Sequence, residues 1–404
     1  MVERPPSEFT RAAIGVVTLC FLLNTLARGN GETFAVFYGP LLDEFGWGRA
    51  ATSSIYSVFM IALGFSGPVI GALFDRFGGR VVYVLGLSAY GIGFLMAARM
   101  EALWQAWLGL GFLAGVGAAA TGMTPATGII SRWFERRMAL AIACAYSGLA
   151  AGAVLLAPLS GLMIEHGGWR WTYQALGLAL LVLAACVVVL PWGRIGRGIK
   201  PAQPVRSLIP DARVFREVPF WGLFCVFFMT STATYVVQVQ AVVFLEDAGY
   251  DRLTATLVFG LTSAVSIIGI VSAGWLTDRY GQRRVATLAY GFSILGVVAL
   301  MALSQGPNIL LLMAFLLCFG GAMGSRGPVV SSLAARLFEG QVGAVFGLIM
   351  IGLGLGGAFG AWIAGWLFEL TGGYTTGLCV SIAASLIGTS MFWIIPALER
   401  GVRS

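Results

Sequence analysis

Charged residues are scarce in this 404-residue chain, because Asp, Glu, Lys and Arg together make up only 11% of it. Soluble domains carry roughly 25% charged residues. The chain is instead 58% hydrophobic, and its mean hydropathy is +0.87. This composition excludes an ordinary water-soluble domain and predicts a protein whose main solvent is lipid.

Histidine, metal-like cysteine pairs and nucleotide-binding loops are also rare or missing. The single His166 lies in a predicted loop, and the six cysteines fall within or beside apolar runs. No Gly-Lys-Ser/Thr sequence of the Walker type occurs, so ATP is not expected to drive the protein. Intramembrane catalysis would need a nucleophile–base pair or two acids at membrane depth, where Glu32 is the only acid. We therefore expect no metal, no cofactor and no enzyme activity.

Apolar runs of about 20 residues, each long enough to cross a bilayer as a helix, follow one another along the chain. Strands of an outer-membrane barrel would alternate in polarity over about ten residues, and these runs do not alternate. The sequence therefore predicts an all-α membrane protein with twelve transmembrane helices. The runs centre near residues 24, 62, 89, 116, 149, 183, 233, 264, 294, 319, 354 and 386.

One long polar connection, from Arg194 to Val218, separates the sixth run from the seventh. It contains three prolines among several basic residues, a composition typical of an extended linker. We predict a six-helix bundle over residues 1–193, a cytoplasmic linker over 194–218 and a second six-helix bundle over 219–404.

The net charge of +7 does not indicate nucleic-acid binding, because the basic residues follow the predicted topology. With the amino terminus in the cytoplasm, Arg28 and Arg326 lie inside apolar runs and four arginines lie in external loops. All other Lys and Arg residues are then cytoplasmic, which is the bias that sets orientation. We predict a multi-pass inner-membrane protein with both termini in the cytoplasm and anionic lipid headgroups as neighbours.

A stretch with a leading glycine, one acid and several basic residues occurs twice. Residues 71–80 read GALFDRFGGR, and residues 274–283 read GWLTDRYGQR, 203 positions later. A duplicated unit of this length predicts two pseudo-symmetric halves with substrate bound between them. Three further landmarks recur at offsets of 203 to 205: Gly46 and Gly249, Arg132 and Arg336, and Gly167 and Gly372.

The repeated stretch also predicts a gate. Gly71 and Gly274 would permit close helix contact near the cytoplasmic surface. The acids can face the positive end of a neighbouring helix, while the arginines contact water and lipid phosphate. Such an ionic latch would hold the bundles together in one state only; the alternative is that these residues merely form turns and set topology. The latch residues are Asp75, Arg76, Arg80, Asp278, Arg279 and Arg283.

Both stretches resemble the signature of the major facilitator superfamily between its second and third helices and its echo between the eighth and ninth. Gly168-Trp169-Arg170-Trp171 is similar to the start of that family's sixth helix. The resemblance covers essentially the whole chain. It implies two six-helix bundles around a central cavity that opens alternately to each side, in a protein that works as a monomer.

Residues 134–152 resemble the fifth-helix signature of monocarboxylate and oxalate/formate-type porters, and residues 37–47 resemble bacterial members of that group. One departure matters. The group usually places a substrate-holding arginine on the eighth helix, whereas residues 253–277 contain no basic residue. If the substrate is a carboxylate, a different residue must hold it. The matching positions are Phe134, Arg136, Arg137, Leu140, Ala141, Ala145, Ser147, Gly148 and Gly152, with Phe37, Pro40, Leu41, Glu44, Phe45, Gly46 and Trp47.

Three ionisable residues lie deep in apolar runs: Arg28, Glu32 and Arg326. A charge at the bilayer centre costs at least ~2.5 kcal/mol, so each needs a partner or a wet cavity. We interpret the two arginines as a binding centre for a small organic anion, because guanidinium binds carboxylate through two parallel hydrogen bonds. Glu32 is the candidate for proton coupling. Burial favours its neutral form, a nearby arginine favours its ionised form, and arrival of an anion could shift the balance between the two. The alternatives are a fixed Arg28–Glu32 ion pair and an Arg326 bonded to backbone carbonyls or to Glu32.

The repeat also selects polar residues that could complete the site. Tyr235 lies 203 positions after Glu32 and shares a helix face with Gln238. Asn24 lies one turn before Arg28. Thr124 on the fourth helix and Tyr146 on the fifth are further candidates. The alternative for all of them is polar packing between helices.

Together these features predict a secondary transporter that moves a small organic anion, a monocarboxylate, by alternating access, with a proton as the candidate coupling ion. Two alternatives remain open at this point. One is a transporter of the same family for a neutral, aromatic or drug-like solute, and the other is a non-transporting membrane sensor.

Overall fold

The computed structural model of the chain describes residues 11–130, 133–134, 138–195, 212–338 and 342–399. We call residues 11–195 the N half and residues 212–399 the C half. Most of the predicted linker lies outside the described residues, as do Arg132, Arg136 and Arg137 and the side chains of Arg28, Asp75 and Asp278.

The described residues form helices and contain no strand. The helices of the N half are α1 (Arg11–Glu32), α2 (Phe34–Phe45), α3 (Arg49–Ala97), α4 (Leu103–Ala106), the π-helix η1 (Trp107–Leu113), α5 (Ala114–Thr121), α6 (Met123–Ile130), α7 (Met138–Val189) and α8 (Trp192–Ile195). Those of the C half are η2 (Ala212–Arg216), α9 (Val218–Gln238), α10 (Ala241–Asp247), α11 (Arg252–Tyr280), α12 (Gln282–Leu303), α13 (Ile309–Ala322), α14 (Arg326–Leu337), α15 (Val342–Thr371), α16 (Thr375–Ile394) and η3 (Pro396–Leu398).

Ten helical segments of the described chain are long and apolar enough to cross a membrane. One of them, Cys144–Val189, spans 46 residues and is interrupted at Gly168, where φ is 79°. The tenth apolar run of the sequence forms the shorter helix α13, which is followed by α14. The all-helical membrane fold is therefore confirmed, and the count of twelve helices stays a prediction.

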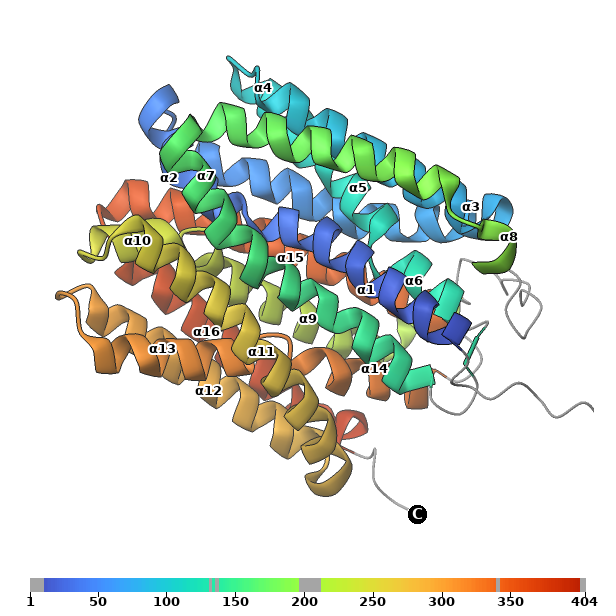
Figure 1. Cartoon of the computed structure of the whole chain (residues 1–404). Coiled ribbons are helices and arrows are strands. Elements are labelled where there is room, and N and C mark those ends of the chain that lie inside the picture. Colours follow the sequence, from blue (N-terminus) through green and yellow to red (C-terminus); the bar gives the residue numbers. More distant parts are fainter. Residues whose placement is uncertain (1–10, 131–132, 135–137, 196–211, 339–341, 400–404) are drawn as a thin grey trace, which may run out of the picture.

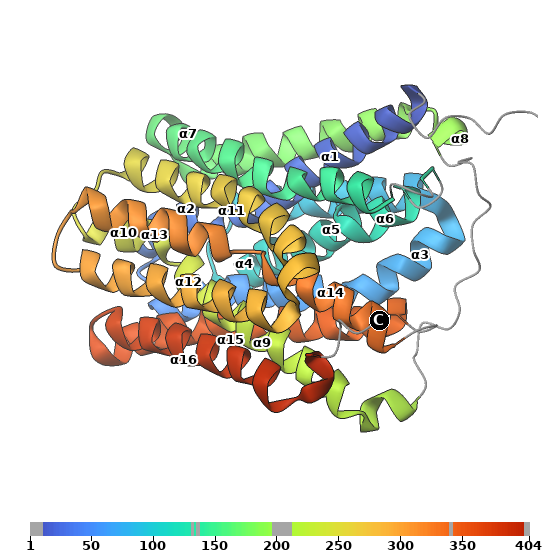
Figure 2. The same cartoon turned by 90° about the horizontal axis from the view of Figure 1, so that it is seen from below.

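The long helices run side by side and leave two opposite ends to the molecule (Figure 1, Figure 2). The described chain begins and ends at one of these ends, which also carries α8; we call it the terminal face. The other, where α2 leads into α3 and α10 leads into α11, we call the Arg49 face. At the Arg49 face Asp251 caps α11 by accepting hydrogen bonds from the Thr254 backbone amide and hydroxyl, which lowers the pKa of its carboxyl group.

Glycines in the repeated stretch make the turns at the terminal face. Gly78 has φ of 78° and Gly281 has φ of 85°, a region that glycine enters without the steric cost of a Cβ. The expected role of Gly71 and Gly274 in close helix contact was wrong for this conformation. A Cβ at Gly274 would meet nothing within 4 Å, and one at Gly71 only the Thr124 methyl at 3.9 Å.

Four helical paths are broken near the middle of the molecule. In the N half α1 gives way to α2 after Glu32, and α5 gives way to α6 at Gly122. In the C half α9 gives way to α10 after Gln238, and α13 gives way to α14 around Gly324, where φ is 76°. Broken backbone at membrane depth is tolerated only inside protein or beside a cavity. Thr33, Gly122, Val239 and Gln240 at the first three breaks are buried, whereas Gly324 at the fourth is exposed.

The halves meet through glycines on long helices. A Cβ added at Gly64 of α3 would lie 3.2 Å from the Cα of Gly354 on α15, so the two backbones touch. A Cβ at Gly260 of α11 would lie 3.5 Å from the backbone of Val154 on α7. Small residues allow this approach, which gives helix packing in lipid its van der Waals energy.

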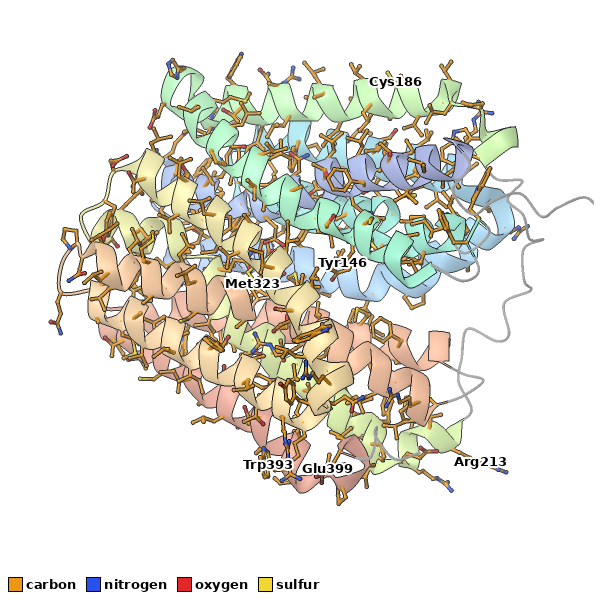
Figure 3. The ribbon with its side chains drawn as sticks, turned by 60° about the horizontal axis from the view of Figure 1, so that its bottom comes forward. Tyr146, Cys186, Arg213, Met323, Trp393 and Glu399 are labelled. Carbon is orange, nitrogen blue, oxygen red and sulfur yellow. The ribbon has the colours of Figure 1, made fainter. Side chains whose placement is uncertain are left out.

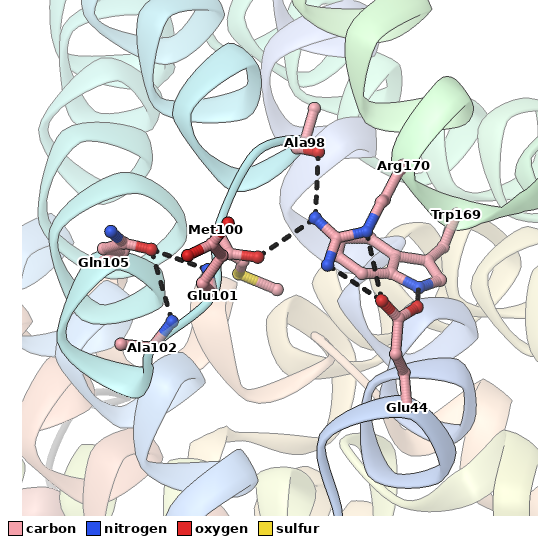
Figure 4. Close-up of polar contacts among 8 residues, drawn as sticks. All are labelled: Glu44, Ala98, Met100, Glu101, Ala102, Gln105, Trp169 and Arg170. Atoms are coloured by element: carbon pink, nitrogen blue, oxygen red, sulfur yellow. Dashed lines mark hydrogen bonds and ion pairs between the residues drawn. The ribbon is translucent and has the colours of Figure 1, made fainter.

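At the Arg49 face a polar cluster holds the N half together (Figure 4). The Arg170 guanidinium donates through Nη2 to Glu44 Oε1 at 2.8 Å and through Nη1 to the Met100 carbonyl at 3.0 Å. Trp169 also donates to Glu44. The Gly-Trp-Arg-Trp motif of the sequence therefore ties the start of its helix to the end of α2 and to the segment after α3.

Candidate transport site between the halves

Glu32 and Gln238, predicted from opposite halves, meet at the centre of the molecule. Gln238 Nε2 donates to Glu32 Oε2 at 2.5 Å. The two side chains are buried, with 8% and 4% of their surface exposed. Each is the last residue of a helix that ends at a break, α1 and α9 respectively. The bond therefore joins the broken helices of the two halves.

Aromatic side chains extend this contact. The Tyr235 ring of α9 lies 5.4 Å from the Tyr56 ring of α3, between centroids, so a predicted site residue again reaches the other half. Ser57 of α3 donates to the Ala358 carbonyl of α15 at 2.7 Å. The middle of the interface is therefore polar and aromatic.

Gln238 also borders a narrow cavity inside the C half. The cavity has room for about one water molecule, and its walls are mostly apolar. Thr262 contributes a hydroxyl, which is already donated to the Phe259 carbonyl at 2.6 Å. In this conformation the cavity is too small for a solute of several heavy atoms. It is lined by Gln238, Ala241, Leu245, Phe259, Thr262, Phe315, Phe319 and Met323.

Arg326 occupies a different place from the one expected beside Arg28. It is the first residue of α14, and its side chain is 2% exposed. Nη2 donates to Ser293 Oγ at 3.2 Å and to the Ala322 carbonyl at 3.3 Å, and the guanidinium carbon lies 4.6 Å from the centre of the Tyr290 ring. Nε and Nη1 have no hydrogen-bond partner among the described residues. Arg326 thus bridges the break between α13 and α14 and faces α12 in its own half.

The remaining predicted binding residues are dispersed. Asn24 is fully buried and donates to the carbonyls of Cys20 and Ala145, so it joins α1 to α7 within the N half. Thr124 is exposed on α6. Tyr146 is 42% exposed and lies between the ribbons of the two halves in Figure 3. The Arg28 side chain is outside the described residues, and its role stays a prediction.

A second contact between the halves, which sequence reasoning missed, lies at the Arg49 face. Arg49 at the start of α3 donates to Asp247 Oδ2 at 3.2 Å and to Tyr374 Oη at 2.6 Å. Its guanidinium carbon lies 3.7 Å from the centre of the Phe368 ring. Glu369 accepts from the Ala50 amide at 2.9 Å. We call Arg49, Asp247, Phe368, Glu369 and Tyr374 the Arg49 cluster.

The electrostatics of the Arg49 cluster favour closure. Burial raises the pKa of the Tyr374 phenol, so it remains a donor to Asp247 at any ordinary pH. Next to the cluster, Gln240 Nε2 donates to Tyr38 Oη at 3.4 Å. Most of α2 and α10 is buried here, including Tyr38 and Val242. Because α2 of the N half packs against α10 of the C half, the two halves are in contact at this face and the molecule is closed there.

The residues of the predicted latch lie at the terminal face. The described contacts of its arginines stay within one half: Arg76 lies over Phe77, and Arg283 pairs with Glu399 at 2.6 Å and lies over the Trp393 ring. Figure 3 shows Trp393 and Glu399 together at the end of the C half. Arg80 and Arg279 are exposed. Because the acids Asp75 and Asp278 are outside the described side chains, the latch stays a prediction.

One sequence signal could have identified the Arg49 cluster. Arg49 belongs to Gly46-Trp47-Gly48-Arg49, a landmark of the internal repeat. Asp247, which pairs with Arg49, and Glu369, which accepts from the neighbouring Ala50 amide, stand alone at helix ends without any motif, so only the fold brings them to this cluster.

The sequence matches the family model of the Major Facilitator Superfamily over residues 17–338 and 273–403. The chain belongs to the major facilitator superfamily. This confirms the family that the repeated stretch indicated, and it makes the protein a membrane transporter of that family.

Similar proteins of this superfamily include transporters from animals and bacteria. Monocarboxylate transporter 13 of Bos taurus is 28% identical over 386 residues, covering 94% of this chain and 88% of the relative. Monocarboxylate transporter 11 of Homo sapiens is 28% identical over 397 residues, covering 94% and 82%. An uncharacterized transporter of Bacillus subtilis, YcxA, is 26% identical over 383 residues, covering 91% of each chain. The resemblance to the monocarboxylate group is thus confirmed.

Proposed function

We propose that the protein moves a small organic anion, a monocarboxylate, by alternating access and couples the movement to a proton through Glu32. In this proposal the Arg49 face is external and the terminal face is cytoplasmic in the inner membrane. The names of the relatives support the substrate class.

The observation that carries the anion assignment is the state of Arg326. Its side chain is buried, and two of its nitrogens, Nε and Nη1, have no partner among the described residues. A buried charge is costly unless it is paired, and guanidinium nitrogens are donors that a carboxylate can accept from. A bound carboxylate would supply both the missing charge and the missing acceptors. Arg28 is the second proposed cationic group.

Another observation supports a competing candidate, a transporter of a neutral or aromatic solute. The Arg326 guanidinium is 2% exposed and turned onto Tyr290 and Ser293 of α12. In that position the arginine serves as a structural cation that caps the carbonyl end of α13. A substrate would then contact only the polar and aromatic interface around Tyr235 and Gln238.

A matched substrate pair separates the two candidates. Purified protein in proteoliposomes would be offered radiolabelled short carboxylates, such as lactate and benzoate, and the corresponding neutral amides, with an inward proton gradient. The anion proposal predicts uptake of at least one carboxylate, loss of that uptake when the gradient is collapsed, and no uptake of its amide. Equal uptake of acid and amide would instead support the neutral-solute candidate.

A further inference from the structure

The Glu32–Gln238 pair connects two hinges. Glu32 ends α1 just before α2, and Gln238 ends α9 just before α10. These two short helices, α2 and α10, close the Arg49 face. The bond at 2.5 Å therefore joins the ends of two helices, one in each half, directly before the short helices packed at that face.

The hydrogen bonding of Gln238 is incomplete. Its Nε2 donates to Glu32, but its Oε1 is buried and has no partner among the described residues. Leaving a buried acceptor unpaired is unfavourable. An ionised carboxylate has only acceptors to offer, whereas a protonated carboxyl group has one O–H donor. A proton on Glu32 would thus supply the one group that the amide lacks.

Arg28 and several tyrosines belong to the helices that carry or adjoin the pair. Arg28 lies one turn back on α1, with its side chain outside the described residues. Four phenols are buried on α2, α3 and α9: Tyr38 on α2, Tyr56 and Tyr90 on α3, and Tyr235 on α9. On the C-half side, the residues of α11 and α13 that line the cavity beside Gln238 carry no titratable group. Glu32 is therefore the acid in this contact between the halves.

We propose that Glu32 binds a proton in the conformation closed at the Arg49 face, and that the resulting acid–amide pair is the lock between the two hinges. The carboxyl O–H donates to Gln238 Oε1, and Gln238 Nε2–H donates to the other carboxyl oxygen. This proposal rests on the proposed role of Glu32 in coupling, and it adds the partner and the conformation in which the proton is held.

The direction of the pH effect follows from linkage. The closed state binds the proton more tightly than the open state, so closure is favoured at low pH and lost as pH rises through the titration of Glu32. Loss of the proton removes one hydrogen bond and places a carboxylate against the amide oxygen. Separation of the halves at the Arg49 face is then favoured.

The experiment measures opening of the Arg49 face without any substrate. Spin labels would be attached at Glu101 and Gln305, two exposed loop positions on opposite halves of that face, after replacement of the six native cysteines. Pulsed electron resonance distances would be recorded in lipid nanodiscs from pH 5 to pH 9. We expect the ratio of open to closed molecules to rise about tenfold, the factor that one hydrogen bond supports.

Three variants test the pair itself. Glu32→Gln can form both hydrogen bonds at every pH, so it should stay closed and lose the pH response. Gln238→Leu should be open at all pH values, and its ratio of open to closed molecules should change less than twofold over the pH range. Gln240→Leu is the matched control, because Gln240 also donates across the halves, to Tyr38 at 3.4 Å, but not to an acid. It should keep the full pH response.

Two results would overturn the lock: a wild-type ratio that is flat with pH, or a Glu32→Gln variant that keeps the wild-type response. Neither result depends on the identity of the solute. Failure of carboxylate uptake in the liposome assay would instead count against the proposed function alone, so the two outcomes are distinguishable.

Discussion

Arg49 and Arg252 stand 203 positions apart, at equivalent landmarks of the internal repeat, and each begins a long helix at the same face. Arg49 reaches across to Asp247 and Tyr374 of the other half. Arg252 pairs with Glu246 of its own half at 2.7 Å. The two equivalent positions of the sequence repeat therefore make different polar contacts: the described side-chain hydrogen bonds of Arg49 cross to the other half, whereas the ion pair of Arg252 stays within its own half.

The intramembrane charges differ in the same way. Glu32 of the N half bonds to Gln238 of the C half, whereas Arg326 contacts Ser293, Ala322 and Tyr290 within the C half. Both residues lie at helix breaks. A break at membrane depth can thus serve either the contact between halves or the interior of one half, depending on which way its side chain points.

The largest expected effect comes from Arg326. If it holds the substrate carboxylate, Arg326→Met should lower carboxylate uptake about 100-fold, since truncating one partner of a buried charge pair costs 2–5 kcal/mol. The thermal midpoint should fall little or rise, because an apolar residue of similar volume often replaces a buried charge without loss of stability. Uptake and scanning fluorimetry measure the two quantities. Retained uptake with a lowered midpoint would assign Arg326 to structure alone.

A smaller effect is expected at the Arg49 face. Arg49→Gln removes the hydrogen bond to Tyr374 and the ion pair with Asp247, whose partners are partly exposed, so we expect the ratio of open to closed molecules to rise about tenfold. Arg252→Gln removes a comparable ion pair that stays within one half, and should change the ratio less than twofold. The spin-label distance between positions 101 and 305 measures both variants. If Arg49→Gln and Arg252→Gln changed the ratio of open to closed molecules equally, the contacts of Arg49 between the halves would have no special role in closure.

The smallest effect is expected from Ser57. Ser57→Ala removes its hydrogen bond to the Ala358 carbonyl across the halves. Such bonds are worth about 0.6 kcal/mol in membrane proteins, so the ratio should shift about threefold toward open. Ser381→Ala is the control, because Ser381 donates to the Ala233 carbonyl at 2.6 Å within the C half. A shift of the same size in Ser381→Ala would mean that the bond to Ala358 has no special role in closure.

Much of the candidate site was predictable, and the reason lies in the cost of polar groups in lipid. Glu32 and Gln238 were identified because an acid at membrane depth needs a partner and because the repeat aligned the first helix with the seventh. Arg326 was identified for the same reason, but the direction in which its side chain points could not be predicted. A helix pattern places a residue on a face, whereas the break at Gly324 decides how α14 is turned and therefore which neighbour Arg326 meets.

The amino-acid sequence by itself determined that the protein lies in a membrane, that it is helical, that it contains an internal repeat, and which family it belongs to. All four depend on composition and on spacing along one chain. The tertiary structure decided which side chains join the halves. Asp247 and Tyr374 meet Arg49, and Glu369 meets the Ala50 amide, only after helices far apart in the sequence have packed through short-range contacts between glycine-bearing backbones. Local patterns record which residues need a partner in lipid, and packing selects the partner.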